Sequence, residues 1–126
     1  MTTPDDLRYA EGHTWSELLD DDLVRVGITD HAQEELGDIV FIELPELDRN
    51  YTSGEECAVV ESVKSASDIY CPITGEIVEV NEDLVNSPEK INADPYGDGW
   101  IFIIKPDDPA ELDDLMDANE YNEFIE

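Results

Sequence analysis

The sequence predicts a mainly β fold, in which two similar half-sheets cover each other as a small flattened barrel or sandwich. Short apolar runs with strand-like alternation recur along the chain, and turn residues separate them. A weak internal repeat supports this architecture: residues 37–42 (GDIVFI) resemble residues 75–80 (GEIVEV), and a turn-rich segment, a glycine and a strand follow each copy. Chance similarity between two strand-turn segments is the alternative explanation of the repeat.

The first half of the chain is expected to be extended, with one helix. We expect extended segments or strands at residues 7–9, 13–17, 23–28 and 39–44. Thr29 or Asp30 can cap a short helix at about residues 30–36, and Gly37 ends it.

The second half combines strands with a C-terminal helical segment. We expect a turn at residues 72–75, strands at 77–80 and 100–104, and a long irregular loop at 81–99, which is rich in proline, asparagine and glycine. Asp107 or Asp108, placed before Pro109, begins a short helix at about residues 109–117, and a second helical turn is expected at 120–124. Residues 1–126 are treated as a single domain, which is long enough to bury a core.

The charge is extreme. The chain has 34 acidic residues against 6 lysines and arginines, a net charge of -28. Nucleic acid is excluded as a partner, because binding it requires a basic surface. Repulsion among the carboxylates is screened at about 1 M salt, where the screening length is roughly 3 Å, so the composition resembles that of proteins from a salty cytoplasm. A solvated acidic surface in an ordinary cell is the alternative.

Membrane spans and catalytic constellations are not found. No apolar run is long enough to cross a membrane and no signal pattern is present, so we expect a cytoplasmic monomer. His13 and His31 fit no metal spacing or nucleophile motif, which indicates that the chain is not an enzyme. Cys57 and Cys71 fall nearly opposite each other on the predicted strands; in a reducing cytosol we expect two free, half-buried thiols, with a disulfide as the alternative.

Lys64 lies near the middle of the sequence and is one of three lysines, with Lys90 and Lys105. Strand-like runs at residues 57–60 and 68–71 flank it, and the link between them is short. So short a link predicts a hairpin at the junction of the two half-sheets, with the lysine amine at its exposed tip. An ordinary surface lysine is the alternative, although so acidic a chain has few others.

Five segments of the chain resemble glycine cleavage system H proteins, in the order of that family. They are residues 27–33 (GITDHAQ), 36–45 (LGDIVFIELP), 61–68 (ESVKSASD), 72–81 (PITGEIVEVN) and 95–100 (PYGDGW). The resemblance implies a lipoyl/biotinyl-type barrel-sandwich hybrid with lipoate in amide linkage to Lys64. It also implies a non-catalytic carrier that takes the aminomethyl group from glycine decarboxylase to a folate-dependent aminomethyltransferase. Dihydrolipoamide dehydrogenase would reoxidise the arm, and a lipoate-attaching enzyme would load it.

The resemblance also suggests which residues surround the arm. In the family, residues beside the first histidine, here His13, line a cleft that shelters the loaded arm, where a carboxylate holds the amine. This sequence lacks the serine and glutamate that often flank that histidine, so Glu11 or Asp68 would supply the charge. Glu61 and Asp68 flank Lys64 and would orient it toward partners.

Biotin is the other cofactor that a displayed lysine can carry, and two further classes of protein remain open. Biotin carriers place methionines beside the lysine, whereas Val63 and Ser65 stand here, which favours lipoate. An interaction domain without a cofactor would show the same strands. The lipoyl or biotinyl domain of a larger acyltransferase or carboxylase is also compatible, but such domains are usually attached through flexible linkers, and none is seen.

Overall fold

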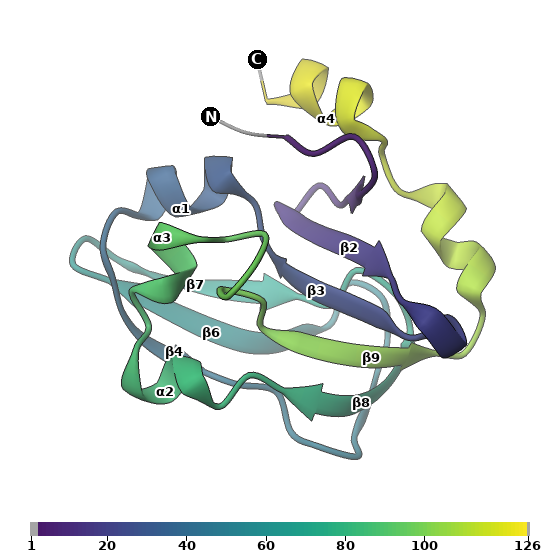
Figure 1. Cartoon of the computed structure of the whole chain (residues 1–126), viewed down its shortest axis with the longest axis horizontal. Helices are drawn as coiled ribbons and strands as arrows, with labels where there is room; N and C mark the ends of the chain where they lie inside the picture. The colour runs from purple at the N-terminus through teal and green to yellow at the C-terminus, as the bar shows by residue number, and fades with distance from the viewer. Residues whose placement is uncertain (1–2, 126) are drawn as a thin grey trace.

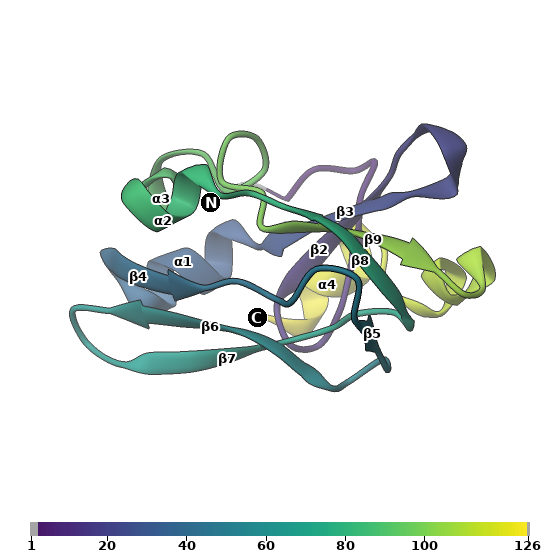
Figure 2. The same ribbon diagram turned by 90° about the horizontal axis from the view of Figure 1, so that it is seen from below.

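A computed structural model describes residues 3–125 and shows two β-sheets packed face to face (Figures 1 and 2). The larger sheet has six strands in the order β1-β2-β3-β9-β8-β5, and the smaller has three in the order β4-β6-β7. The strands of the larger sheet are β1 (Arg8–Tyr9), β2 (Thr14–Leu18), β3 (Val24–Ile28), β9 (Phe102–Pro106), β8 (Gly75–Val80) and β5 (Asn50–Tyr51). Those of the smaller sheet are β4 (Ile39–Glu43), β6 (Glu56–Ser62) and β7 (Ala66–Tyr70). All strand pairs are antiparallel.

Within residues 3–125, four short α-helices accompany the sheets. They are α1 (Asp30–Leu36), α2 (Asp83–Asn86), α3 (Lys90–Ala93) and α4 (Ala118–Phe124), with 3-10 segments at Asp20–Asp22 and Pro109–Asp114. The first three lie beside one end of the sheets, and α4 lies near β1 (Figure 1). The Thr29 hydroxyl accepts the Ala32 N–H at the start of α1, which confirms the predicted cap.

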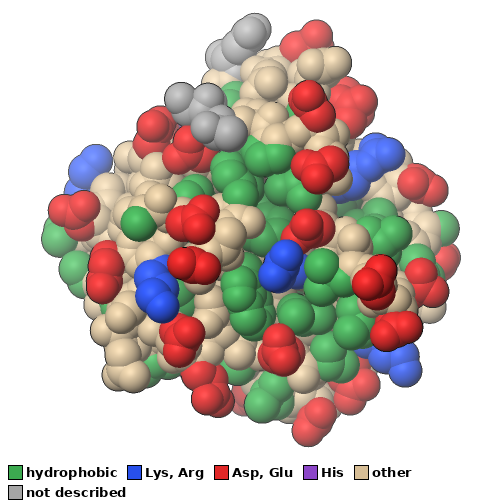
Figure 3. Space-filling model, in the orientation of Figure 1, with side chains coloured by type: hydrophobic (Ala, Val, Ile, Leu, Met, Phe, Trp, Pro, Cys, Tyr) green, Lys and Arg blue, Asp and Glu red, His purple; other side chains and the backbone are tan. Residues whose placement is uncertain are grey.

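The main core fills the space between the two sheets. Val24 and Val26 of β3, Ile77 of β8 and Val60 of β6 are among its buried members. A second, smaller cluster lies beneath α4, where Tyr9, Trp15 and Tyr121 are buried and the Tyr9 and Tyr121 rings stack at 4.8 Å. Alternation along each strand places these apolar side chains on one face and the acidic ones in solvent. Acidic side chains are accordingly spread over the molecular face in Figure 3.

The mainly β prediction is confirmed, with two corrections to the arrangement. The two copies of the predicted repeat do lie in different sheets, as β4 and β8, but the sheets are unequal in size. The lysine hairpin is formed by β6 and β7; it does not join two half-sheets but supplies two of the three strands of the smaller one.

Two predictions for the second half are wrong in part. Residues 81–99 contain the helices α2 and α3, each anchored by one buried apolar residue, Leu84 or Ile91. The helix predicted at 109–117 is a 3-10 segment that stops at Asp114, because Met116 forms a β-bridge with Tyr9 through two hydrogen bonds of 2.8 Å. The helical turn expected at 120–124 is confirmed within α4.

Candidate functional site

The lysine hairpin has a two-residue tip, Val63 and Lys64. The Ser62 N–H donates to the Ser65 carbonyl at 2.8 Å, which closes the turn. The Ser62 hydroxyl accepts the N–H groups of Lys64 and Ser65, each at 3.1 Å. The Ser62 side chain therefore satisfies two N–H groups within the turn, and neither tip residue has a positive φ. The predicted hairpin is confirmed, with Lys64 exposed at its tip.

The hairpin tip is tied to the segment that follows α1. The Val63 N–H donates to the Asp38 carbonyl at 3.0 Å. The Asn92 side chain in α3 holds the same segment from the other side, because its amide donates to the Gly37 carbonyl and its oxygen accepts the Ile39 N–H. These bonds fix the position of the tip relative to the link between α1 and β4 and, through that link, to α3.

The aliphatic stem of Lys64 lies against Gly37, the residue that ends α1. A Cβ atom placed on Gly37 would stand 3.2 Å from the Lys64 Cε atom, which is tighter than ordinary packing. Gly37 has φ 80° and ψ -157°, a conformation that is nearly restricted to glycine. Lys64 forms no ion pair within residues 3–125, so its amine is available for chemistry.

A cleft of about 320 Å³ opens beside the hairpin; we call it the histidine cleft. It is lined by Gly12, His13, Ile28, His31, Ala32, Glu35, Leu36, Val60, Ser67, Asp68 and Ile69. The wall toward the core is apolar, whereas His13, His31, Glu35 and Asp68 provide polar groups, and Glu35 lies 3.7 Å from the His31 ring nitrogen. The His13 and His31 rings are 5.1 Å apart.

His13 is held by the C-terminal helix α4. Its Nδ1 atom lies 2.8 Å from the hydroxyl of Tyr121, which also lies 2.7 Å from the hydroxyl of Thr29, the residue that caps α1. Burial, together with the neighbouring His31, lowers the pKa of His13, so the neutral imidazole is favoured. Sequence reasoning missed Tyr121, because no spacing rule connects residues 108 positions apart.

The structure separates the residues predicted to surround the arm. His13 and Asp68 line the histidine cleft together. Glu61 is exposed on β6, where it pairs with Ala66 of β7 and Phe41 of β4. Thr14, which follows His13, is buried and places no charge in the cleft.

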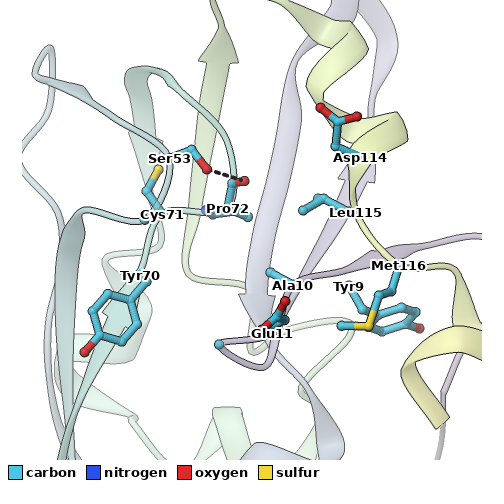
Figure 4. Close-up of a pocket in the computed structure, with 12 residues that line it drawn as sticks. Tyr9, Ala10, Glu11, Ser53, Tyr70, Cys71, Pro72, Asp114, Leu115 and Met116 are labelled. Carbon is cyan, nitrogen blue, oxygen red and sulfur yellow. Dashed lines mark hydrogen bonds between the residues drawn. The ribbon is translucent and has the colours of Figure 1, made fainter. Parts of the chain in front are cut away.

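Glu11 lines a second cleft of about 380 Å³ (Figure 4). Tyr70 and Cys71 lie on one side of this space, Leu115 and Met116 lie on the other, and Glu11 lies between them. Gly12 borders both clefts.

The two cysteines are free and fully buried, whereas half-buried thiols were expected. A hydrogen bond with Cys71, together with burial, raises the pKa of the Cys57 thiol and keeps it protonated. Among residues 3–125 no group of three or more potential ligands could hold a metal ion. No helix in that part of the chain is long and apolar enough to cross a membrane.

Comparison with known proteins places the chain in a family. The model of the glycine cleavage H-protein family matches residues 7–126. A glycine cleavage system H protein of Alkalilimnicola ehrlichii is 53% identical over 122 residues, which are 97% of this chain and 94% of that protein. One of Shewanella frigidimarina is 55% identical over 125 residues, 99% of this chain and 97% of that protein.

A solved structure agrees. The crystal structure of a glycine cleavage system H protein from Mycobacterium marinum superposes with a TM-score of 0.87 at 42% identity, covering 95% of this chain and 96% of that one. Proteins of this kind carry lipoate on a lysine and have the barrel-sandwich fold. The chain therefore belongs to the glycine cleavage H-protein family, the lipoyl carriers of the glycine cleavage system.

Proposed function

We propose that Lys64 is the residue of this chain that carries the lipoyl group, and that residues 1–126 act as one carrier domain without catalytic activity of their own. The observation that carries the proposal is an exposed amine, free of ion pairs within residues 3–125, at the tip of a tethered two-residue turn. Lys90, in contrast, pairs with Asp83 at 3.8 Å, and Lys105 lies on β9 in the larger sheet. A fixed base with a flexible side chain suits a group that must visit several enzymes.

The residues around the tip fit a lipoyl group. Amide formation removes the charge of the amine, and no carboxylate among residues 3–125 is paired with Lys64 and would lose its partner. The histidine cleft offers an apolar wall of Ile28, Leu36 and Val60 for an aliphatic chain. When bound, the lipoyl group supplies a cyclic disulfide that can open to take up an aminomethyl group.

Within the histidine cleft, we assign to Asp68 the role of the carboxylate that holds the amine of the loaded arm. It is exposed at the rim, where a carboxylate attracts an ammonium group without itself being desolvated. Glu11 lines the other cleft, which makes it the weaker candidate. The neutral imidazole of His13 adds a hydrogen-bonding group without a competing positive charge.

Four enzymes are proposed as partners, each for a different task. Glycine decarboxylase and aminomethyltransferase would exchange the aminomethyl group, dihydrolipoamide dehydrogenase would reoxidise the arm, and a lipoate-attaching enzyme would form the amide. Most of these act at the far end of the arm. Only the last must reach the amine of Lys64 itself.

Lys64→Arg tests the proposal. Arginine keeps the positive charge but cannot form the amide, so lipoylation should be lost while the melting temperature is retained. Lys90→Arg and Lys105→Arg are the matched controls and should be lipoylated as the parent protein is. Intact mass and site mapping after incubation with a lipoate ligase give the answer. Modification of Lys90 or Lys105 in the parent protein would refute the assignment.

A further inference from the structure

Strand β4 contains a bulge beside the lysine hairpin. Ile39 pairs with Ser62 and Phe41 pairs with Glu61, so Val40 is an extra residue with no partner of its own on β6. The bulged residue Val40 and the next residue, Phe41, are both exposed, by 55% and 48%. A regular strand would have turned one of the two toward the core. The bulge therefore presents two large apolar side chains to solvent where one is usual.

Further apolar side chains continue this surface toward the lysine. Val63, which directly precedes Lys64, is 68% exposed. Ala66 is exposed across from Glu61, which in turn lies across from Phe41. We call Val40, Phe41, Val63 and Ala66 the bulge patch. The beginning of β4 and the hairpin tip lie at the same end of the smaller sheet (Figure 2).

The charge around the bulge patch has one sign. Glu61 stands between Phe41 and Ala66, and Glu43 lies one row further along β4, opposite Val59. Apart from Lys64 at the tip, the two sets of cross-strand partners, at Glu61 and at Val59, include no basic residue. A protein that covers the patch therefore needs an apolar contact surface with basic residues at its edge.

We propose that the bulge patch is the docking surface for the enzyme that attaches lipoate to Lys64, an inference that rests on the proposed function. In the unmodified protein, the amine of Lys64 is separated from the backbone of the hairpin tip only by the lysine side chain. An enzyme that joins it to an activated lipoyl carboxyl must approach within bonding distance, and so covers Val63 and the adjacent β4 bulge. The amine nitrogen forms the amide bond, loses a proton, and displaces the group that had activated the carboxyl. Enzymes that work on the distal disulfide do not need this approach.

Val40→Ser/Phe41→Ser tests the docking surface. Both residues are exposed, so the melting temperature should stay unchanged. Leu18→Ser/Leu47→Ser is the matched control, since these leucines are 57% and 50% exposed and lie outside the smaller sheet. Binding is measured between each unmodified carrier and a purified lipoate ligase loaded with a non-reactive lipoyl-adenylate analogue, at one fixed salt concentration. Lipoylation of Lys64 is then followed by mass under steady-state conditions.

The patch variant should bind about tenfold more weakly, with KM raised by a similar factor and kcat retained, because apolar side chains at the centre of an interface carry most of its energy. The control should bind as the parent protein does. Equal binding by the patch variant and the parent would overturn the proposal. Once loaded with excess ligase, the patch variant should be a normal substrate of dihydrolipoamide dehydrogenase, and a tenfold loss there would also overturn the assignment. Failure to lipoylate the parent at Lys64 would instead refute the proposed function.

Discussion

Replacing Gly37 by alanine should lower the stability of the fold and disturb the contact between residue 37 and the aliphatic stem of Lys64. At φ 80° and ψ -157° an alanine is strained by about 1–3 kcal/mol. Its Cβ would also stand 3.2 Å from Lys64 Cε, so the stem has to shift by a few tenths of an ångström. We expect the free energy of unfolding to fall by about 1–3 kcal/mol, which is roughly 4 °C in Tm for each kcal/mol in a chain of this size. Urea unfolding in molar potassium chloride measures the first effect, and the rate of Lys64 lipoylation measures the second.

Gly54→Ala separates the two effects. Gly54 also has a positive φ, 88°, but nothing lies within 4 Å of the Cβ it would gain. This variant should lose stability through backbone strain alone, by about 1 kcal/mol, and be lipoylated at the parent rate. If Gly37→Ala unfolds at the same urea concentration as the parent protein, the strain argument is wrong. If both variants are lipoylated equally fast, contact between Gly37 and the stem has no role in presenting the lysine.

Three further predictions concern charge and the histidine cleft. Because the net charge is -28, the Tm should rise steeply from low to molar potassium chloride, and a flat Tm would contradict this. Tyr121→Phe leaves His13 and Thr29 without their shared partner and should lower the free energy of unfolding by about 1–3 kcal/mol, whereas Tyr70→Phe, at an exposed position, should change it little. The folded state lowers the pKa of His13, so the unfolded chain binds the proton more readily. Stability should therefore be complete above the ordinary histidine pKa of about 6.5 and decline as pH falls toward the folded value; His13→Asn should show a smaller decline in urea unfolding between pH 7.5 and 5.5.

Local patterns in the sequence were sufficient for the hairpin and for α1. The link between the flanking strands leaves room only for a tight turn, and Thr29 and Gly37 mark the ends of the helix through hydrogen bonds and backbone geometry that neighbouring residues decide. The family resemblance offered Glu11 or Asp68 as the carboxylate near His13, and the sequence alone could not show that only Asp68 shares a cleft with this histidine.

The missed features depend on contacts between distant segments. The bulge in β4 cannot be seen in the run of apolar residues 39–42, because alternation does not show which residue lacks a partner on β6. The helices α2 and α3 are too short for helical periodicity and depend on burying Leu84 and Ile91. The prediction of a helix at 109–117 was wrong in part, because β-pairing of Met116 with Tyr9 overrides the helical spacing of the last residues.

During synthesis the hairpin and the histidine cleft should become complete at different times. The smaller sheet is built from residues 39–70, whose pairings are close in sequence and can form early. The hydrogen bond that holds His13 can form only after Tyr121, 108 residues later, has been synthesised. A growing chain can thus display Lys64 on a formed sheet while His13, which lines the cleft, still lacks its hydrogen bond to Tyr121. Enzymes that contact only the hairpin could modify such a chain. Reactions that need His13 held in the histidine cleft can occur only after α4 has docked.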